Sequence, residues 1–154
     1  MTTRPYVPGT VTRFRKTITE TDMVLFAGIT GDFAANHTDE EYMRDTPFGT
    51  RHVHGALVAG FMSTVAAKAL EDARPEGLVP VSAGYDKMRF LESVFPGDTL
   101  ELVYEFNDDF DPDRLRATAS VRAEVAGKTV AVATHVVTWV RAPKPALTAS
   151  EPGV

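Results

Sequence analysis

Residues 31–68 read GDFAANHTDEEYMRDTPFGTRHVHGALVAGFMSTVAAK, and this stretch decides the fold. It runs into residues 54–72, where apolar or small side chains occupy nearly every angle of a helix until Lys68. A helix that is apolar all round must be surrounded by protein on all sides. The apolar run of residues 56–67 is shorter than the roughly 20 residues that span a bilayer. We therefore expect a buried central helix and no membrane partner.

The second half of the chain changes to strand-like patterns. These are rich in β-branched and alternating apolar side chains, and they predict strands at residues 79–92, 98–107, 114–125 and 128–141, after an earlier one at residues 9–18. The Pro, Gly and Asp residues between the later strands are typical of turns. Consecutive strands with short turns predict an antiparallel meander. We expect an α+β domain in which a curved antiparallel β-sheet wraps around the long central helix.

Two shorter helices are predicted from their capping residues. Thr19 is a suitable N-cap for a helix over residues 20–29, because an acidic residue follows three positions later. Gly28 and Gly31 are predicted to end this helix, because glycine tolerates the left-handed conformation that ends helices. Thr38 is predicted to cap a second, acidic helix over residues 39–45 in the same way. The loop between these helices is therefore short.

Length and composition fit a single domain over residues 1–141, with a flexible Pro- and Ala-rich tail over residues 142–154. The net charge of −5 argues against a nucleic-acid partner, because binding phosphates needs a clustered basic surface. The absence of cysteine excludes disulfides, thiolate metal sites and cysteine nucleophiles. The N-terminal residues lack the apolar core of a signal peptide, so a cytoplasmic location is expected.

The chemistry is concentrated where the loop meets the long helix. Asp32 and His37 lie five positions apart, and His54 and Gly55 begin the helix. A buried carboxylate beside an imidazole can divide two proton transfers, each worth on the order of 10²–10⁴-fold. The first amides of a helix lack intrahelical partners and can stabilise a developing negative oxygen. An acid, a base and an oxyanion donor are therefore expected within one site.

Three motifs resemble the MaoC-like, (R)-specific enoyl-CoA hydratase family of the hotdog fold. They are residues 31–39 (GDFAANHTD), residues 53–55 (VHG) and residues 95–100 (FPGDTL). The similarity covers residues 10–141. The family usually reads Asp-x-Asn-Pro-x-His, whereas Ala34 and Ala35 stand here in place of Asn-Pro, and Asn36 precedes the histidine.

The resemblance implies that Asp32 and His37 are the catalytic pair. It also implies that Gly55 is the backbone donor to the thioester carbonyl, and that Ser63, about two helical turns further on, is a pocket residue. Hydration of a 2-enoyl thioester needs a base for water at C3 and an acid at C2. In our working assignment Asp32 polarises the water, and His37 orients it and passes the proton to C2. The residues alone do not decide which group handles which proton.

The implied activity is that of a hydro-lyase in fatty acid metabolism. It would reversibly add water to a trans-2-enoyl-CoA, or a related carrier-protein thioester, to give the (R)-3-hydroxyacyl thioester. No cofactor is implied beyond the coenzyme A of the substrate. The resemblance also implies a homodimer or a dimer of dimers, with two sheets joined edge to edge and the acyl tunnel near the interface.

The other histidines and Ser63 also have structural interpretations. His54 is interpreted as a structural residue near the helix start, His52 as a rim or surface residue and His135 as a packed, hydrogen-bonded histidine within a strand. The spacing of the histidines and Asp32 matches no recognised metal motif, so no metal site is expected. Ser63 either lines the pocket or lets the sheet approach the helix.

Two other functions remain open. In a hotdog thioesterase, Asp32 would activate water against the thioester carbonyl instead of C3. In a non-catalytic acyl-thioester-binding subunit, suggested by the altered Ala34-Ala35 sequence, the pocket would bind without turnover. Release of free thiol separates hydrolysis from hydration.

Overall fold

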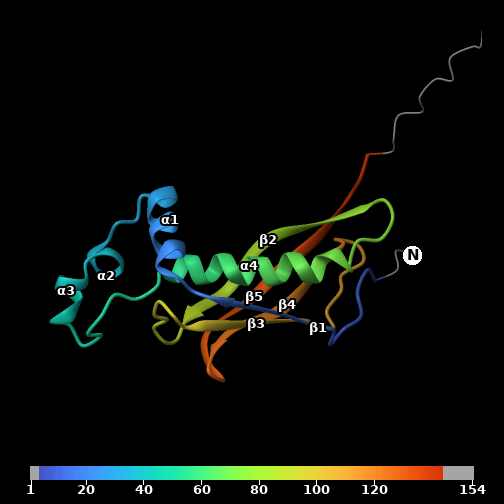
Figure 1. Ribbon diagram of the computed structural model, residues 1–154. Helices are drawn as coiled ribbons and strands as arrows, with labels where there is room; N and C mark the ends of the chain where they lie inside the picture. Colours follow the sequence, from blue (N-terminus) through green and yellow to red (C-terminus); the bar gives the residue numbers. More distant parts are fainter. Residues whose placement is uncertain (1–3, 144–154) are drawn as a thin grey trace, which may run out of the picture.

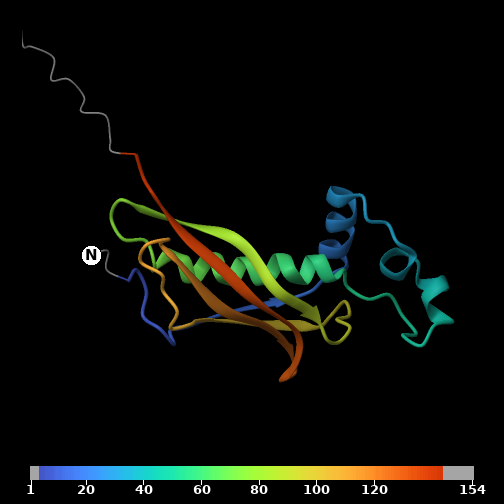
Figure 2. The same ribbon diagram turned by 180° about the vertical axis from the view of Figure 1, so that it is seen from behind.

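The computed structural model describes residues 4–143, so the predicted tail lies almost wholly outside the described residues. The elements are, in order, β1 (Val11–Thr17), α1 (Glu20–Thr30), α2 (Ala35–Thr38), α3 (Glu40–Arg44), α4 (Gly55–Glu71), β2 (Leu78–Phe90), β3 (Thr99–Phe106), β4 (Arg116–Val125) and β5 (Lys128–Arg141). Helix α4 lies along one face of a curved five-stranded sheet, while α1, α2 and α3 project beyond one end of it (Figure 1). The reverse view shows the strands crossing in front of the helix, on the sheet side of the molecule (Figure 2). This is the hotdog arrangement, and it confirms the predicted α+β fold.

The sheet has the strand order β1-β3-β4-β5-β2, with every pair antiparallel. The predicted meander is confirmed for β3, β4 and β5. It is wrong for β2, which pairs with β5 at one edge instead of with β3. The reason lies in the turn before β3: Gly97 donates to the Ile18 carbonyl and Ile18 donates to the Asp98 carbonyl, both at 2.8 Å. These bonds fix the turn beside the end of β1, on the other side of the sheet.

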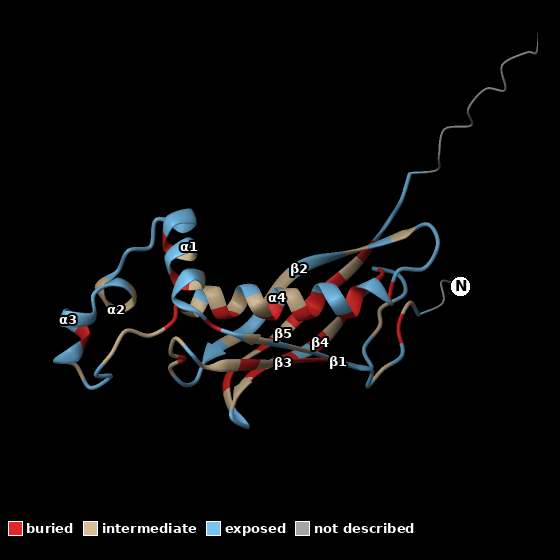
Figure 3. Ribbon diagram, viewed as in Figure 1, coloured by how far each residue is buried: buried red, intermediate tan, exposed pale blue. Residues whose placement is uncertain are grey.

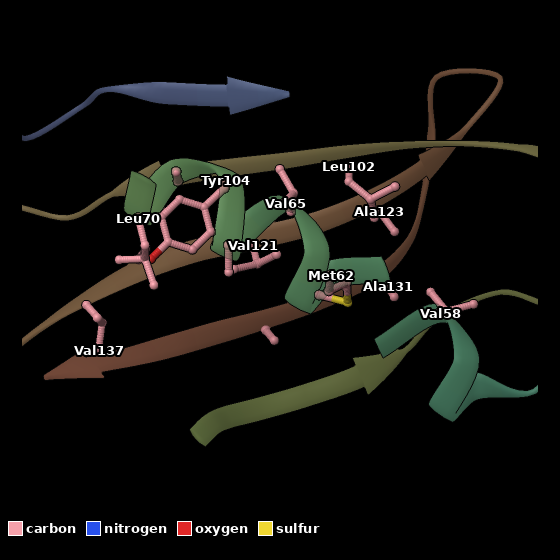
Figure 4. Close-up of a cluster of buried hydrophobic side chains, with 14 of the residues drawn as sticks. Val58, Met62, Val65, Leu70, Leu102, Tyr104, Val121, Ala123, Ala131 and Val137 are labelled. Atoms are coloured by element: carbon pink, nitrogen blue, oxygen red, sulfur yellow. The ribbon is translucent and has the colours of Figure 1, made fainter. Parts of the chain in front are cut away.

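The core forms between α4 and the sheet. Val58, Met62 and Val65 of α4 lie among buried side chains of β3, β4 and β5 (Figure 4). The opposite side of α4 is uncovered (Figure 3). The exposed residues of α4 are Ala56, Gly60, Ser63, Ala67, Lys68 and Glu71. The expectation that protein surrounds this helix on all sides is therefore not met within one chain, because no second layer covers its outer face.

The N-cap predicted for α1 is confirmed, and the N-cap predicted for α3 is wrong. Thr19 and Asp22 form both halves of a capping box, and Gly31, with φ 78°, ends α1 in the left-handed conformation. Asp39, not Thr38, caps α3, through a bond from the Tyr42 amide. The Thr38 hydroxyl instead donates to carbonyls of the preceding loop at 3.1 Å, because Thr38 closes the extra turn α2.

The pairing of β2 with β5 has two irregularities, one between Ser82 and Gly84 and a second nearer the end of the strand. Asp86 pairs with Thr134 and Arg89 pairs with Val132, so two residues of β2 oppose one residue of β5. This is a β-bulge, and Lys87 within it has φ 53°. None of the helices within residues 4–143 is both long and apolar enough to cross a membrane.

Candidate active site

Asp32, His37 and His54 meet beside the N-terminal end of α4, with their side-chain ligand atoms within 4.8 Å of one another. Asp32 follows the glycine that ends α1, His37 lies in α2, and His54 directly precedes α4. The structure therefore brings the predicted pair together. The Asp32 carboxylate is exposed, however, and not buried as expected, because α1 and α2 project beyond the sheet and nothing in the described chain covers it.

His54 holds the two predicted catalytic residues in place. It is 1% exposed, and its ring stacks on that of His37 with centroids 3.9 Å apart and planes 29° apart. Its Nε2 donates to the backbone carbonyl of Asp32 at 3.1 Å. Its Nδ1 is buried and has no hydrogen-bond partner in the described chain. His54 therefore fixes both the Asp32 backbone and the plane of the His37 ring.

The tautomer of His37 follows from its hydrogen bonds. Its Nδ1 lies 2.7 Å from the backbone carbonyl of His52, and a carbonyl can only accept, so Nδ1 carries the proton. Its Nε2 is then an acceptor, and the amide of Asn36 donates to it at 3.1 Å. The same Asn36 nitrogen lies 3.1 Å from His52 Nε2. Asn36 thus bridges two imidazoles, and the single lone pair of His37 Nε2 accepts its hydrogen.

His52 is more enclosed than a rim position would be. It is half-buried, and its pKa is lowered by burial and, to a smaller extent, by the neighbouring His37 and His54. Its ring also packs edge-on against Phe48, with centroids 4.9 Å apart. His52 therefore helps to hold the Asn36 side chain in place through their hydrogen bond.

Arg51 connects the projecting helices to the segment before α4. Its guanidinium pairs with Glu20 of α1 at 2.9 Å and with Glu40 of α3 at 2.8 Å. Hydrogen bonds from Thr50 and Arg51 lower the pKa of Glu40 to about 2. The first residues of α1 and of α3 are thus both tied to residues 50–51.

A pocket of about 420 Å³ opens beside these residues. His37, His52, Gly55, Phe90 and Val130 are among its lining residues. The amides of Gly55 and Ala56 lie in the first turn of α4, where no intrahelical acceptor exists, and no other described residue accepts from them. A Cβ at residue 55 would lie 2.8 Å from the Phe90 ring. Glycine is therefore needed here for the close approach of Phe90.

Ser63 lies apart from this pocket. It lines a second cavity of about 340 Å³ between α4 and β2, together with Ser82 and His135. Eight residues separate Gly55 from Ser63, which corresponds to about 12 Å along the helix. The structure thus places Ser63 in a pocket, but not beside Asp32 and His37.

Comparison with known proteins identifies the family. The family model for the MaoC like domain matches residues 6–138. The chain belongs to the MaoC-like domain family. The (R)-specific enoyl-CoA hydratase of Rhodospirillum rubrum is 35% identical over 115 residues, which cover 75% of this MaoC-like chain and 75% of that protein.

A longer curated protein and a solved structure are also similar to this chain. Protein MaoC of Klebsiella aerogenes is 40% identical over 90 residues, which cover 57% of the MaoC-like chain but only 25% of that longer protein. The solved (R)-hydratase from A. caviae involved in PHA biosynthesis is 25% identical, with a TM-score of 0.75 over 86% of this chain and 96% of that one. The chain thus spans about a quarter of one curated relative and three quarters of the other.

Among the described residues of the MaoC-like chain, Asp32, His37 and His54 form the group that could hold a metal ion. The rings of His37 and His54 stack face to face, whereas shared coordination needs their nitrogens to point edge-on at one ion. The absence of a resident metal remains a prediction.

Sequence reasoning missed two residues of this site. Asn36 was noted only as a departure from the family pattern, although its position next to His37 was the available signal. Phe90 gave no signal, because it is distant in sequence and reaches Gly55 only through the fold.

Proposed function

We propose that this MaoC-like protein is a hydratase that reversibly adds water to a trans-2-enoyl thioester and forms the (R)-3-hydroxyacyl thioester. The observation that carries the proposal is the convergence of Asp32, His37 and the unpaired Gly55 amide around one end of α4. The similarity to a protein named (R)-specific enoyl-CoA hydratase supports the reaction and its stereochemistry.

The reaction balances with the groups present. The water oxygen bonds to C3 while its proton passes to the Asp32–His37 pair, and the same pair delivers a proton to C2. One H and one OH are added, and no redox partner is needed. His37 Nε2 carries no proton, so it can orient and deprotonate water once water replaces Asn36 as its hydrogen-bond partner, while the exposed carboxylate of Asp32 polarises the water.

The thioester oxygen gains negative charge as water attacks. An amide in the first turn of α4 is a suitable donor, because it has no intrahelical partner and lies at the positive end of the helix dipole. One such donor is worth about 3 kcal/mol in other oxyanion sites. The Phe90 ring packed against Gly55 forms the wall that limits where the thioester can lie.

The test is the incubation of the protein with crotonyl-CoA. We expect the enoyl-thioester absorbance to decay without release of free thiol, and chiral separation to give the (R)-3-hydroxy product. Thiol release in step with the decay would mean hydrolysis and would replace this proposal with the thioesterase. Binding without decay over a series of chain lengths would indicate the non-catalytic subunit.

We further propose that the partner of this chain is a second copy. Strand β2 is a 13-residue edge strand with only β5 beside it, and its apolar residues Val79 and Val81 are 38% and 42% exposed. The uncovered small residues of α4 lie next to it. Exposed apolar edges of this length promote pairing with another strand. Two copies joined through β2 would cover both features.

Sedimentation measures the assembly directly. We expect a dimer, or a dimer of dimers, at micromolar concentration, and a shift to monomer in Val81→Lys, because charged residues on an edge strand oppose pairing. A wild-type monomer at that concentration would contradict the proposal.

A further inference from the structure

Asn36 lies between two imidazole rings of the active site. Its Nδ2 is 3.1 Å from Nε2 of His37 and 3.1 Å from Nε2 of His52. The backbone ties the same residues together, because the His52 amide donates to the Asn36 carbonyl at 3.2 Å and His37 Nδ1 donates to the His52 carbonyl at 2.7 Å. No other hydrogen bond within residues 4–143 involves the Asn36 side chain. This side-chain amide can therefore turn over without breaking a bond elsewhere.

The positions of the ring hydrogens follow from these two contacts. An amide nitrogen carries two hydrogens and accepts none, so both Nε2 atoms must be acceptors. His37 then carries its ring hydrogen on Nδ1, in agreement with its bond to the His52 carbonyl. His52 must also carry its hydrogen on Nδ1, and that atom is buried without a partner in the described chain. The backbone thus fixes the tautomer of His37, whereas only Asn36 fixes that of His52.

A proton on His37 reverses these requirements. Nε2 of the charged ring is a donor, and it faces an amide nitrogen that also only donates. The contact is restored if the Asn36 amide turns by about 180° around its Cβ–Cγ bond, which places Oδ1 between the two rings. His52 Nε2 must then donate as well, so the ring of His52 gives up its Nδ1 hydrogen to water and takes one at Nε2. The number of protons on His52 stays the same.

A proton on His52 instead of His37 has no equally good arrangement. His52 Nε2 would require the Asn36 oxygen, which would then lie against the lone pair of His37 Nε2. Burial and, to a smaller extent, the neighbouring His37 and His54 lower the pKa of His52, which also favours its neutral form. The hydrogen bonds of Asn36 therefore direct the proton to His37.

The nearby charged groups favour the same ring. The ligand atoms of Asp32, His37 and His54 lie within 4.8 Å of one another. A carboxylate at that distance stabilises a charged imidazole. The charged groups that line this pocket or adjoin His52 in the chain are engaged in ion pairs, namely Arg51 with Glu20 and Glu40, and Glu92 with Lys128.

From this geometry we infer that Asn36 and His52 are positioning residues for His37, which act through one coupled change. When His37 takes a proton on Nε2, the Asn36 oxygen turns inward and His52 changes from its Nδ1–H to its Nε2–H tautomer. Both nitrogens of His37 then remain hydrogen-bonded, so the ring keeps its orientation between accepting a proton and returning it. The role in turnover rests on the proposed hydration, whereas the tautomer change does not.

Long-range proton–nitrogen correlation NMR of the free protein observes the tautomer of His52 directly, because protonated and unprotonated ring nitrogens have separate chemical shifts. We expect His52 to change from the Nδ1–H to the Nε2–H pattern in the pH range in which His37 gains its second proton, while His52 itself gains none. His52→Gln identifies the signals by their loss. An unchanged His52 tautomer, or a second proton on His52 in that range, would overturn the inference.

Two variants at Asn36 separate this coupling from simple packing. Asn36→Leu removes the amide, so the His52 tautomer should no longer follow His37. Asn36→Asp offers only accepting oxygens, so His52 should show the Nε2–H pattern over the whole pH range. Tyr42→Phe, at an exposed position of α3, is the control and should keep the wild-type coupling. Coupling that persisted in Asn36→Leu would refute the role of Asn36.

Kinetics tests the link with turnover. In Asn36→Asp the carboxylate should hold the proton on His37, so the acid limb of kcat/KM for crotonyl-CoA should move to higher pH by about one unit or more. A merely structural role would lower kcat/KM by the same factor at every pH, and that result would overturn the role in turnover. Absence of hydration by the wild-type protein would count against the proposed function alone, because the NMR measurement needs no substrate.

Discussion

The four histidines of this protein lie in two contrasting environments. His37, His52 and His54 gather at the N-terminal end of α4, where Nδ1 of both His52 and His54 has no hydrogen-bond partner within residues 4–143 and the neighbouring Asp32 is exposed. His135 lies under the middle of the helix, fully buried and with both ring nitrogens hydrogen-bonded. The first environment suits a ring that exchanges protons during a reaction. The second holds a ring in one neutral form.

The largest expected effect is at the proton-exchanging end. Asp32→Asn should lower kcat for enoyl-thioester hydration by about 10²–10⁴-fold, because one of the two proton-transfer groups is lost. The exposed position predicts no loss of stability, which circular dichroism during heating can check. Asp45→Asn, an exposed carboxylate in the same segment, is the matched control. Wild-type kcat in Asp32→Asn would remove the basis of the proposed mechanism.

The buried end is tested through the pH dependence of stability. The pKa of His135 is about 4 when folded, against about 6.5 in the unfolded chain. Between these values the unfolded chain binds more protons, so the free energy of unfolding falls as the pH is lowered. The contribution is about 3 kcal/mol over the whole range. Urea unfolding from about pH 7 to about pH 4 measures it.

The comparison for this measurement is His135→Gln. Glutamine does not titrate, so the variant should lose this part of the pH dependence even if it is less stable overall. An equally steep fall in the free energy of unfolding of the variant would show that His135 is not the titrating group.

His54→Phe tests how the catalytic end is held. Phenylalanine preserves an aromatic ring against His37 but removes the bond to the Asp32 carbonyl. We expect a decrease in kcat/KM of about tenfold and a change in stability of about 1 kcal/mol. His54→Ala also removes the stacked ring and should cost more of both. Unchanged kcat/KM in His54→Phe would mean that the ring stack alone positions the site.

The smallest effect is expected at Asn36. Asn36→Ala removes both hydrogen bonds to His37 and His52 and should lower kcat/KM by about threefold to tenfold. Steady-state kinetics with a short enoyl-CoA would measure this. A value equal to wild type would mean that the His52 carbonyl suffices to orient His37.

Local sequence patterns were sufficient to predict most helices and strands of the fold. The apolar run predicted α4, and alternating β-branched residues predicted all five strands to within a few residues. The pairing of β2 with β5 was missed because neighbours in a sheet are decided by contacts between distant segments, such as those of Ile18 with Gly97 and Asp98. The prediction that Thr38 caps the acidic helix was wrong, because the extra turn α2 ends at Thr38 and Asp39 becomes the cap.

In the site, too, residues within short motifs were predicted, and features that depend on distant segments were not. Asp32, His37 and Gly55 belong to short motifs and were located from sequence; the structure places Asp32 beside His37, and His37 lines the same pocket as Gly55. The exposure of Asp32 was not predicted, because it depends on how far α1 and α2 project from the sheet. Phe90 joins the pocket from the end of another strand, which no local pattern reveals.

The bulge between Asp86 and Arg89 determines which face of the sheet the side chains at the end of β2 point to. Tyr85 and Phe90 are five positions apart, an odd interval that in a regular strand puts two side chains on opposite faces. The additional residue between Asp86 and Arg89 restores them to the same face, so Tyr85 stacks on His135 while Phe90 reaches Gly55. Deleting a single residue there would turn the Phe90 ring to the outer face and uncover the helix end. In related sequences, a one-residue insertion or deletion at this point should therefore be interpreted as a change in the pocket wall.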